Sequence, residues 1–321
     1  MYIFLKVPPL VKERHYRLSS VYVDGGGPLV LDTIRTIRKI ALTGLFSNDL
    51  LLERFVLKGG SALELVYNLS SRASIDIDIS MEDDFTADEI NDIKRLVEEA
   101  LGEKFIAAGY YLFDFTFGPR PMILRANAPA FWGGYNIDFK IIPLATAQTL
   151  NFDIEQLRRR SSIATPSQGK KFQIEISKHE YCKEKTYGEI DGYKISVYTL
   201  RTILFEKLRA VCQQMKAYPH MKTASPRPRD FYDIQKIMAV EKIPSTLSPA
   251  DIEIITAVFA QKEVPLVLLD SIDQYKDFHQ QDLTSLLDTL AIAERAVFDF
   301  DSCYAQVVAL GKNILAIKHS R

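Results

Sequence analysis

Two carboxylates in an alternating segment could together bind a divalent cation. Between Ser74 and Ser80, isoleucine and aspartate alternate, so an extended chain would place Asp76 and Asp78 on one face and the isoleucines on the other. The two carboxylates would lie about 6.5–7 Å apart along such a strand. Mg²⁺ or Mn²⁺ would suit this pair, because such ions bind carboxylate oxygens together with substrate phosphates. Taken alone, an Asp-x-Asp strand is more often a solvated face.

A glycine turn upstream of this pair could bind phosphates. The turn is Lys58-Gly59-Gly60-Ser61, between a short β-type run and an expected helix that extends to about Tyr67. The glycines let backbone N–H groups approach a triphosphate, the helix N-terminus adds a favourable dipole, and Ser61 could donate its hydroxyl. A Gly-Gly-Ser turn alone is common, but a glycine turn, a short helix and an Asp-x-Asp strand in this order are far more specific. Two cations there could polarise the α-phosphate of a nucleoside triphosphate (NTP) and stabilise the pyrophosphate leaving group.

Composition and motif searches exclude several classes of protein. The 321 residues include 40 Lys+Arg and 41 Asp+Glu, so the charge does not indicate a strongly basic nucleic-acid binder. Three scattered cysteines indicate a reducing compartment, with no disulfide framework and no zinc site. No P-loop and no HExxH motif is present. No apolar run approaches the roughly 18–20 residues of a membrane helix, and the N-terminus does not fit a signal peptide, so we expect a cytoplasmic protein without a membrane partner.

Hydrophobic periodicity predicts an α/β half followed by a helical half. After an irregular arm (1–28), a helix is expected over 29–43, and Thr86 with Glu89 forms a capping box for a helix to about Ala108. Further expected strands are 110–117, 121–125, 135–142, 172–177 and 193–198. Further expected helices are 156–160, 199–217, 229–240, 249–261, 281–298 and 302–317. The fold class is therefore α/β (α+β), with a mixed sheet and flanking helices in residues 1–198 and a helical domain in residues 199–321.

Five segments, in order, resemble a known family. They are KGGSAL (58–63), RASIDID (72–78), FQIEISK (172–178), YTLRTILFEKLRA (198–210) and RPRDFYDI (227–234). The sequence resembles the AbiEii/AbiGii-type nucleotidyltransferases, the toxins of type IV abortive-infection toxin–antitoxin systems within the DNA polymerase β-like nucleotidyltransferase superfamily. The resemblance spans roughly residues 50–240 and implies a nucleotidyltransferase-type sheet, an NTP substrate and a cognate antitoxin.

The resemblance also implies a role for each matching residue. Asp76 and Asp78 match the metal-binding pair, and Ser61 matches the phosphate-contacting serine. Lys207 matches a lysine directed at the nucleotide phosphates, although a lysine beside an apolar helix face often extends to solvent. Asp230 matches a catalytic or lysine-orienting carboxylate, although it could instead be a first-turn acidic residue favoured by the helix dipole. The nucleotide-binding set implied is Lys58, Gly59, Gly60, Ser61, Arg72, Ser74 and, as a second-rank member, Lys140.

Two residues compete for the position of a third metal-binding carboxylate. Glu175 and Asp138 both alternate with apolar residues in expected strands. Glu175 is preferred because it falls where the family has its later acidic strand. The helical half would supply Lys207 and Asp230, so we expect the site to lie between the two halves.

The acceptor is expected to be RNA, by resemblance the 3′ end of tRNA. Basic residues cluster at 158–160, 170–171 and 216–229, which could form a phosphate track, although any one such cluster is usually a solvated face. Candidates for base stacking are Tyr110, Tyr111, Phe131 and Trp132. Two alternatives remain open: a metal-dependent nuclease that uses the same carboxylates, and a non-catalytic nucleotide-binding module.

Overall fold

The structure is a computed structural model, which describes residues 28–69, 76–123, 128–129, 131–162, 164, 169–221 and 223–320. Arg72 and Ser74 of the implied nucleotide-binding set lie outside the described residues. So do the first 27 residues of the expected arm and the first two residues of the expected strand 74–80.

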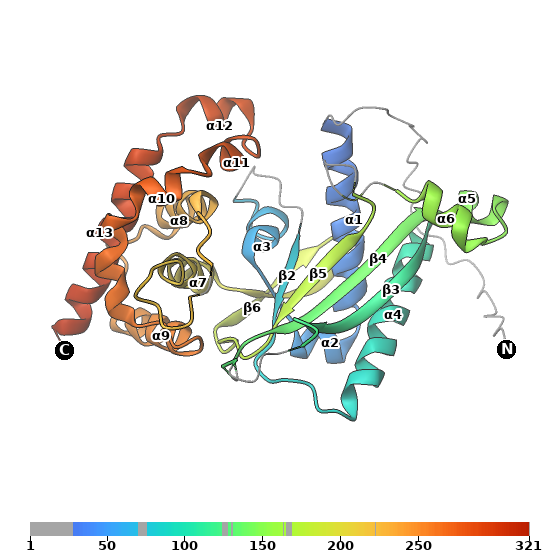
Figure 1. Ribbon diagram of the computed structural model, residues 1–321, viewed down its shortest axis with the longest axis horizontal. Helices are drawn as coiled ribbons and strands as arrows, with labels where there is room; N and C mark the ends of the chain where they lie inside the picture. Colours follow the sequence, from blue (N-terminus) through green and yellow to red (C-terminus); the bar gives the residue numbers. More distant parts are fainter. Residues whose placement is uncertain are drawn as a thin grey trace.

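One mixed sheet of seven strands organises the described residues (Figure 1). The strands are β1 (Val56–Lys58), β2 (Ile77–Ser80), β3 (Tyr110–Arg120), β4 (Gly134–Pro143), β5 (Phe172–Ser177), β6 (Lys185–Ile190) and β7 (Tyr193–Tyr198). Their spatial order is β3-β4-β5-β2-β1-β7-β6. The pairs β2–β5 and β1–β7 are parallel and the other neighbours are antiparallel. The expected mixed sheet is therefore confirmed.

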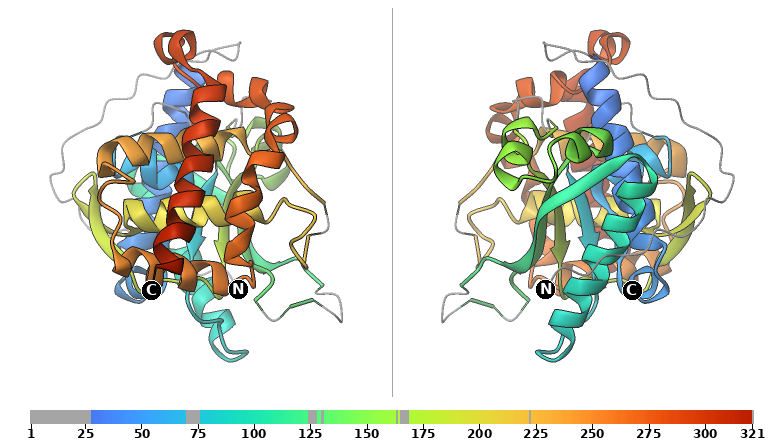
Figure 2. Two further views of the ribbon diagram at one scale, coloured as in Figure 1. Left: turned by 90° about the vertical axis from the view of Figure 1, so that its left-hand side faces the viewer. Right: turned by 90° about the vertical axis from the view of Figure 1, so that its right-hand side faces the viewer.

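The central strands bury one face and leave the other polar. Ile77 and Ile79 of β2 are buried, whereas Asp78 is partly exposed and Asp76, just before the strand, is exposed. Two long helices, α1 (Pro28–Phe46) and α4 (Glu89–Ala107), cover the apolar face (Figures 1 and 2). We call the opposite side, which carries the two aspartates, the polar face. The alternation expected from the sequence is confirmed.

Short helices occupy the connections of the sheet. They are α2 (Asp49–Arg54), α3 (Gly59–Leu65), α5 (Leu144–Thr149) and α6 (Ile154–Arg160). Thr86 and Glu89 exchange the expected capping bonds before α4, with 2.9 Å from the Thr86 N–H to the Glu89 carboxylate and 3.3 Å from the Glu89 N–H to the Thr86 hydroxyl. The expected helix over 29–43 corresponds to α1, and β5 and β7 have the bounds that the sequence predicts.

Helices alone follow β7 in the described residues. They are α7 (Leu200–Cys212), α8 (Pro228–Glu241), α9 (Pro249–Ala260), the 3₁₀ helix η1 (Leu266–Gln274), α10 (Lys276–Gln280), α11 (Leu283–Leu287), α12 (Ile292–Val297) and α13 (Phe300–His319). None of the described helices is long and apolar enough to cross a membrane. One apolar core contains residues from both halves of the chain. At Tyr198 the structure therefore changes from a sheet with helices to helices alone, but the core continues. That the two halves are independent domains stays a prediction.

Three expected elements were wrong, and one strand was missed. The expected helix 281–298 is divided into α11 and α12, because Leu286 and Leu290 turn into a small separate core with Tyr232 while Ala291 is extended. The expected strand 121–125 is absent over 121–123, since Pro121 has no N–H for the sheet and β3 ends at Arg120. The expected helix 199–217 ends at Cys212. The sequence analysis also missed β6, a mostly exposed edge strand without apolar alternation.

Candidate active site

Strand pairing places four polar side chains in one row on the polar face. Lys58 of β1 is paired with Asp78 of β2, Asp78 with Glu175 of β5, and Glu175 with Asn136 of β4. Side chains of directly paired residues point to the same side of a sheet. The row, which we call the carboxylate row, therefore contains a lysine, two adjacent carboxylates and an amide.

Asp78 lies within this row, between Lys58 and Glu175. Burial raises its pKa to about 6, and the negative charges of Glu175 and Asp76 add to the effect, while Lys58 and Lys207 oppose it. The charge of Lys207 thus acts on Asp78 from the other half of the chain. Burial and the two neighbouring carboxylates thus disfavour the charged form of Asp78.

Gly59 lets Asp78 lie directly against the glycine turn. Its φ of +66° is in the left-handed region, and a Cβ at this position would be 2.7 Å from Oδ2 of Asp78. Any side chain here would therefore push the carboxylate out of the row. This is a more specific use of the glycine than the phosphate contact predicted from the sequence.

Ser61 is fully buried and holds the segment that carries Asp76. Its hydroxyl donates to the backbone carbonyl of Asp76 at 2.6 Å and accepts from Nη2 of Arg38 at 2.9 Å. Arg38 also donates to Glu64 at 2.8 Å. The hydroxyl is thus engaged within the protein, and the predicted contact between Ser61 and a phosphate stays a prediction. The sequence analysis missed Arg38, although an arginine four residues after Ile34 within an apolar helix stripe is a usable signal.

Lys58 is the cation of a buried charge network rather than a free side chain. Its Nζ lies 3.5 Å from Glu180 and 3.4 Å from Glu206. Burial lowers the pKa of Lys58, but the two carboxylates outweigh it and raise the pKa above its ordinary value. Lys58 therefore stays charged beside Asp78, and Glu180 and Glu206 are its carboxylate partners.

Glu180 joins this network to the helical half. It accepts from Arg209 at 2.9 Å and lies 3.3 Å from Nζ of Lys262, which also donates to the carbonyls of Phe131 and Lys178. Burial raises the pKa of Glu180, but the surrounding cations outweigh it and lower the pKa below 4.5. We call Lys58, Glu180, Glu206, Arg209 and Lys262 the charge hub. No local pattern in the sequence points to it.

Lys207 is buried between two aspartates of α8. Its Nζ lies 2.9 Å from Oδ1 of Asp230 and 2.8 Å from Oδ2 of Asp233. The aspartates are three residues apart and share one face of the helix. Lys207 therefore does not extend to solvent, which was the alternative that the sequence left open. Arg227 lies 3.5 Å from the second oxygen of Asp230.

The two candidates for a third carboxylate have different neighbours. Glu175 lies beside Asp78 in the row and forms an ion pair with Arg120. Asp138 is paired with Gln173, so β5 separates it from β2, and it accepts from Lys171 at 2.9 Å and from Asn136 at 2.6 Å. The place of Glu175 beside Asp78 therefore favours Glu175 over Asp138 as the third metal-binding carboxylate.

Lys140, the second-rank nucleotide candidate, is not brought to the row. Its Nζ lies 2.9 Å from Asp114 of β3, and Arg158 of α6 contacts the same carboxylate at 2.8 Å. This cluster lies toward the β3–β4 edge of the sheet.

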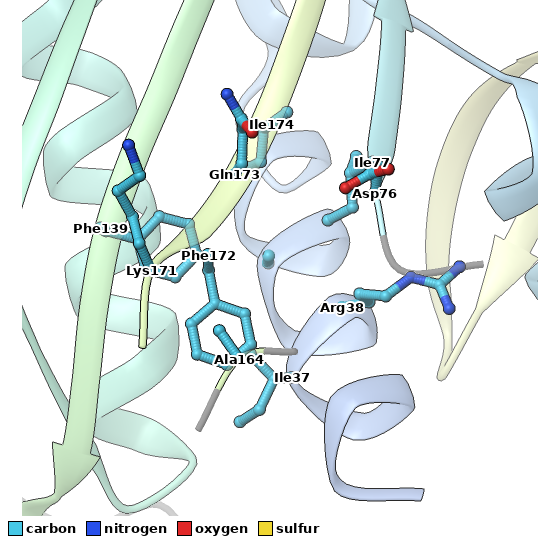
Figure 3. Close-up of a pocket in the computed structure, with 11 residues that line it drawn as sticks. Ile37, Arg38, Asp76, Ile77, Phe139, Ala164, Lys171, Phe172, Gln173 and Ile174 are labelled. Atoms are coloured by element: carbon cyan, nitrogen blue, oxygen red, sulfur yellow. The ribbon is translucent and has the colours of Figure 1, made fainter. Parts of the chain in front are cut away.

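A small cavity lies beside Asp76, where β2 and β5 begin. Its volume is about 60 Å³, and Figure 3 shows Asp76 and Gln173 on neighbouring strands, with Arg38 nearby on α1. Binding pockets for small molecules usually measure about 300–1,000 Å³, so this cavity cannot contain an NTP.

The carboxylates fit a divalent cation by chemistry and by charge. In the described part of the chain, no three His, Cys, Asp or Glu side chains are gathered closely enough to form a ready-made metal site. Asp78 and Glu175 nevertheless offer adjacent oxygen donors, with Asp76 next to them, and their mutual repulsion contributes to the raised pKa of Asp78. A cation would relieve this repulsion, and oxygen donors suit Mg²⁺ or Mn²⁺.

A mixed sheet with a carboxylate row and a following helical half agrees with the class expected from the sequence, the nucleotidyltransferases. The chain belongs to the AbiEii family: the model of the family "Nucleotidyl transferase AbiEii toxin, Type IV TA system" matches residues 40–306. It is therefore a nucleotidyltransferase of a toxin–antitoxin family, and its substrate is an NTP. No curated protein matches the chain.

The solved structures that match the chain share little sequence with it. JHP933 from Helicobacter pylori is 16% identical, with a TM-score of 0.46, and the match covers 92% of this chain and 97% of that chain. MenT4, a nucleotidyltransferase toxin from Mycobacterium tuberculosis H37Rv, is 12% identical, with a TM-score of 0.43 and coverage of 89% and 84%.

Proposed function

We propose that this toxin transfers a nucleoside monophosphate from an NTP to an RNA acceptor, and that the transfer depends on a divalent cation held by Asp76, Asp78 and Glu175. The observation that carries the proposal is the adjacency of Asp78 and Glu175 on the polar face, with the charge of Lys207 acting on Asp78. In the reaction, the acceptor hydroxyl oxygen bonds to the α-phosphorus, the bond from that phosphorus to the β-phosphate oxygen breaks, and pyrophosphate and a proton leave.

Each residue of the site has a separate task in this proposal. A bound cation would supply charge neutralisation at the α-phosphate and the leaving group. Ser61 fixes the backbone at Asp76 through its hydrogen bond to the carbonyl. Asp230 and Asp233 keep Lys207 charged and directed, so that its ammonium can bind the triphosphate as a compact cation.

The proposed RNA path crosses the polar face from the side of α6. Leu157 of α6 packs with Ile142, which shares a strand face with Asp138 and Lys140, so α6 lies over the same face as the row. Arg159 and Arg160 are exposed there, and Arg227 and Arg229 are exposed at the start of α8. Arg158 and Lys171 are engaged by Asp114 and Asp138 and contribute less free charge. The 3′ end of tRNA is the narrower form of this proposal.

The aromatic residues expected to stack on RNA bases give the proposal little support. Phe131 is buried and contacts His220, with 5.4 Å between the ring centroids. Tyr111 packs against Phe113 and Phe152. We therefore assign recognition of the acceptor to charge rather than to these rings, and binding should weaken steeply with salt.

One experiment separates the proposal from its two alternatives. The protein is incubated with Mg²⁺, each of the four labelled NTPs and total RNA, and labelled RNA and released pyrophosphate are measured. The proposal expects label in RNA and an equal amount of pyrophosphate, and loss of both in Asp78→Asn. A nuclease would shorten RNA without NTP, and a binding module would retain NTP without releasing pyrophosphate; either result would overturn the proposal.

A further inference from the structure

Arg120 is a cation of the site that no sequence pattern indicates. It is the last residue of β3, and its guanidinium reaches across β4 to the carboxylate of Glu175 on β5. Its side chain is 51% exposed and that of Glu175 is 38% exposed. This pair therefore lies at the solvent side of the carboxylate row, next to Asp78.

The two cations that flank the carboxylates are held in different ways. Lys58, beside Asp78, is 14% exposed and is fixed by Glu180 and Glu206 in the charge hub. Arg120 has Glu175 as its only ion-pair partner within the described residues. An exposed ion pair of this kind contributes little free energy and separates readily. Lys58 is thus a fixed charge of the site, and Arg120 a movable one.

The guanidinium uses the same oxygens that a metal ion would need. Arg120 contacts Oε1 of Glu175, and Glu175 is the strand neighbour with which Asp78 would share a cation. The two cations compete for this carboxylate, because a metal ion bound to it would repel a guanidinium at hydrogen-bond distance.

We propose that Arg120 is an exchangeable counter-ion of Glu175, which leaves this carboxylate when a divalent cation binds and then contacts a phosphate of a substrate. The inference rests on the proposed metal role of Asp78 and Glu175 but goes beyond it. A guanidinium freed at this place remains on the polar face, and its planar donors suit a phosphate oxygen pair. The phosphate can belong to the NTP or to the acceptor backbone.

The exchange is tested by Mn²⁺ binding, measured from the loss of the free Mn²⁺ signal in electron paramagnetic resonance, without nucleotide. Arg120→Ala should bind Mn²⁺ about three- to tenfold more tightly than the wild type, since the competing charge is gone. The matched control is Arg295→Ala on α12, because Arg295 is also half-exposed (52%) and also pairs with a carboxylate, Asp288 at 3.7 Å. This control should bind Mn²⁺ as the wild type does.

A double variant locates the competition at Glu175. In a Glu175→Gln background, Arg120→Ala should change Mn²⁺ affinity by less than about half of its effect in the wild type, since the shared carboxylate is absent. Unchanged or weaker Mn²⁺ binding in Arg120→Ala would overturn the inference, as would an equal effect in both backgrounds. The proposed function fails separately, if Asp78→Asn binds Mn²⁺ as well as the wild type does.

The second half of the inference is tested at saturating Mn²⁺. The KM for NTP and the KM for RNA are measured for Arg120→Ala and Arg295→Ala. If one of these KM values rises about threefold or more in Arg120→Ala but not in Arg295→Ala, the guanidinium contacts a phosphate of that substrate. If both constants are unchanged while metal binding tightens, Arg120 does not pass to a substrate phosphate, and this half is wrong.

Discussion

The two faces of the central sheet divide stability from chemistry along the same strands. On β2 and β5, Ile77, Ile79 and Ile174 are buried under α1 and α4, while Asp78 and Glu175 between them form the carboxylate row. Neighbouring residues on a strand point to opposite faces, so a shift of one position exchanges the two roles. The strand pairing that forms the core therefore also aligns Asp78 and Glu175, and no separate loop is needed to bring these carboxylates together.

The largest expected effect is on the polar face. Asp78→Ala should lower nucleotide transfer by about 10³-fold or more, since several kcal/mol of transition-state stabilisation depend on the cation. Its free energy of unfolding should stay within about 1 kcal/mol of the wild type, because no apolar side chain is lost. Activity assays and urea unfolding measure the two quantities. Asp138→Ala, a polar-face carboxylate outside the row, is the control and should keep most of the activity; a stable and fully active Asp78→Ala would break the division.

The charge hub departs from this division between the two faces, because it includes Lys58 of the carboxylate row and is nevertheless expected to stabilise the fold. Glu180→Gln should lower the free energy of unfolding by about 3–5 kcal/mol, because it removes the carboxylate that Arg209 and Lys262 share and leaves Arg209 with Glu206 alone. Urea unfolding checks this result, with exposed Glu189→Gln as a control that should change little. Wild-type stability in the variant would show that the hub does not hold the two halves together.

The same residue predicts a pH dependence of stability. Since the folded pKa of Glu180 is below 4.5, its contribution is complete above pH 4.5 and is lost as pH falls toward the folded value. Stability of the wild type should therefore decline below pH 4.5 more steeply than that of Glu180→Gln. Urea unfolding at intervals between pH 3 and 6 should give two curves that converge toward low pH. Parallel curves would contradict this assignment of the pKa.

Substitutions on the apolar face should lower the free energy of unfolding by a similar or smaller amount than Glu180→Gln does. Ile79→Ala should cost about 2–5 kcal/mol of unfolding free energy, and Ile79→Val about 0.5–1.5 kcal/mol, because Ile79 is fully buried. Activity per folded molecule should remain near that of the wild type at a temperature where both variants are folded. A loss of activity as large as that of Asp78→Ala would mean that the two faces are not separable.

A separate effect, on nucleotide binding, is expected for Lys207. Lys207→Ala should weaken NTP binding by about 1.5–3 kcal/mol, or roughly 10- to 150-fold, through loss of a charge-assisted contact. Lys236→Ala is the control, because Lys236 is an ion-paired lysine of the helical half whose partner is Glu294. Nucleotide titration by fluorescence measures both variants, and an unchanged affinity in Lys207→Ala would make its two aspartates a purely structural arrangement.

The features of the fold and site that could be predicted from the sequence are those that leave a local pattern in it. The alternation of isoleucine and aspartate indicated β2, and the three-residue spacing of Asp230 and Asp233 indicated a shared helix face. Glu180 and Arg120 escaped because their partners are distant in the chain: 29 positions separate Glu180 from Arg209, and 55 separate Arg120 from Glu175. Such contacts depend on how strands and helices are arranged in space, and one sequence carries no periodicity for them.

The order in which the site's parts occur along the chain affects the cell that synthesises this toxin. A ribosome that has completed Glu175 has made all three carboxylates, yet β7, which pairs with β1, and Lys207 with its two aspartates are still untranslated. Domains fold as units during synthesis, and here the sheet itself is unfinished before Tyr198. On the proposed roles, a polypeptide released early by interrupted translation would be harmless to its host, and neutralisation becomes necessary only after the eighth helix has left the exit tunnel.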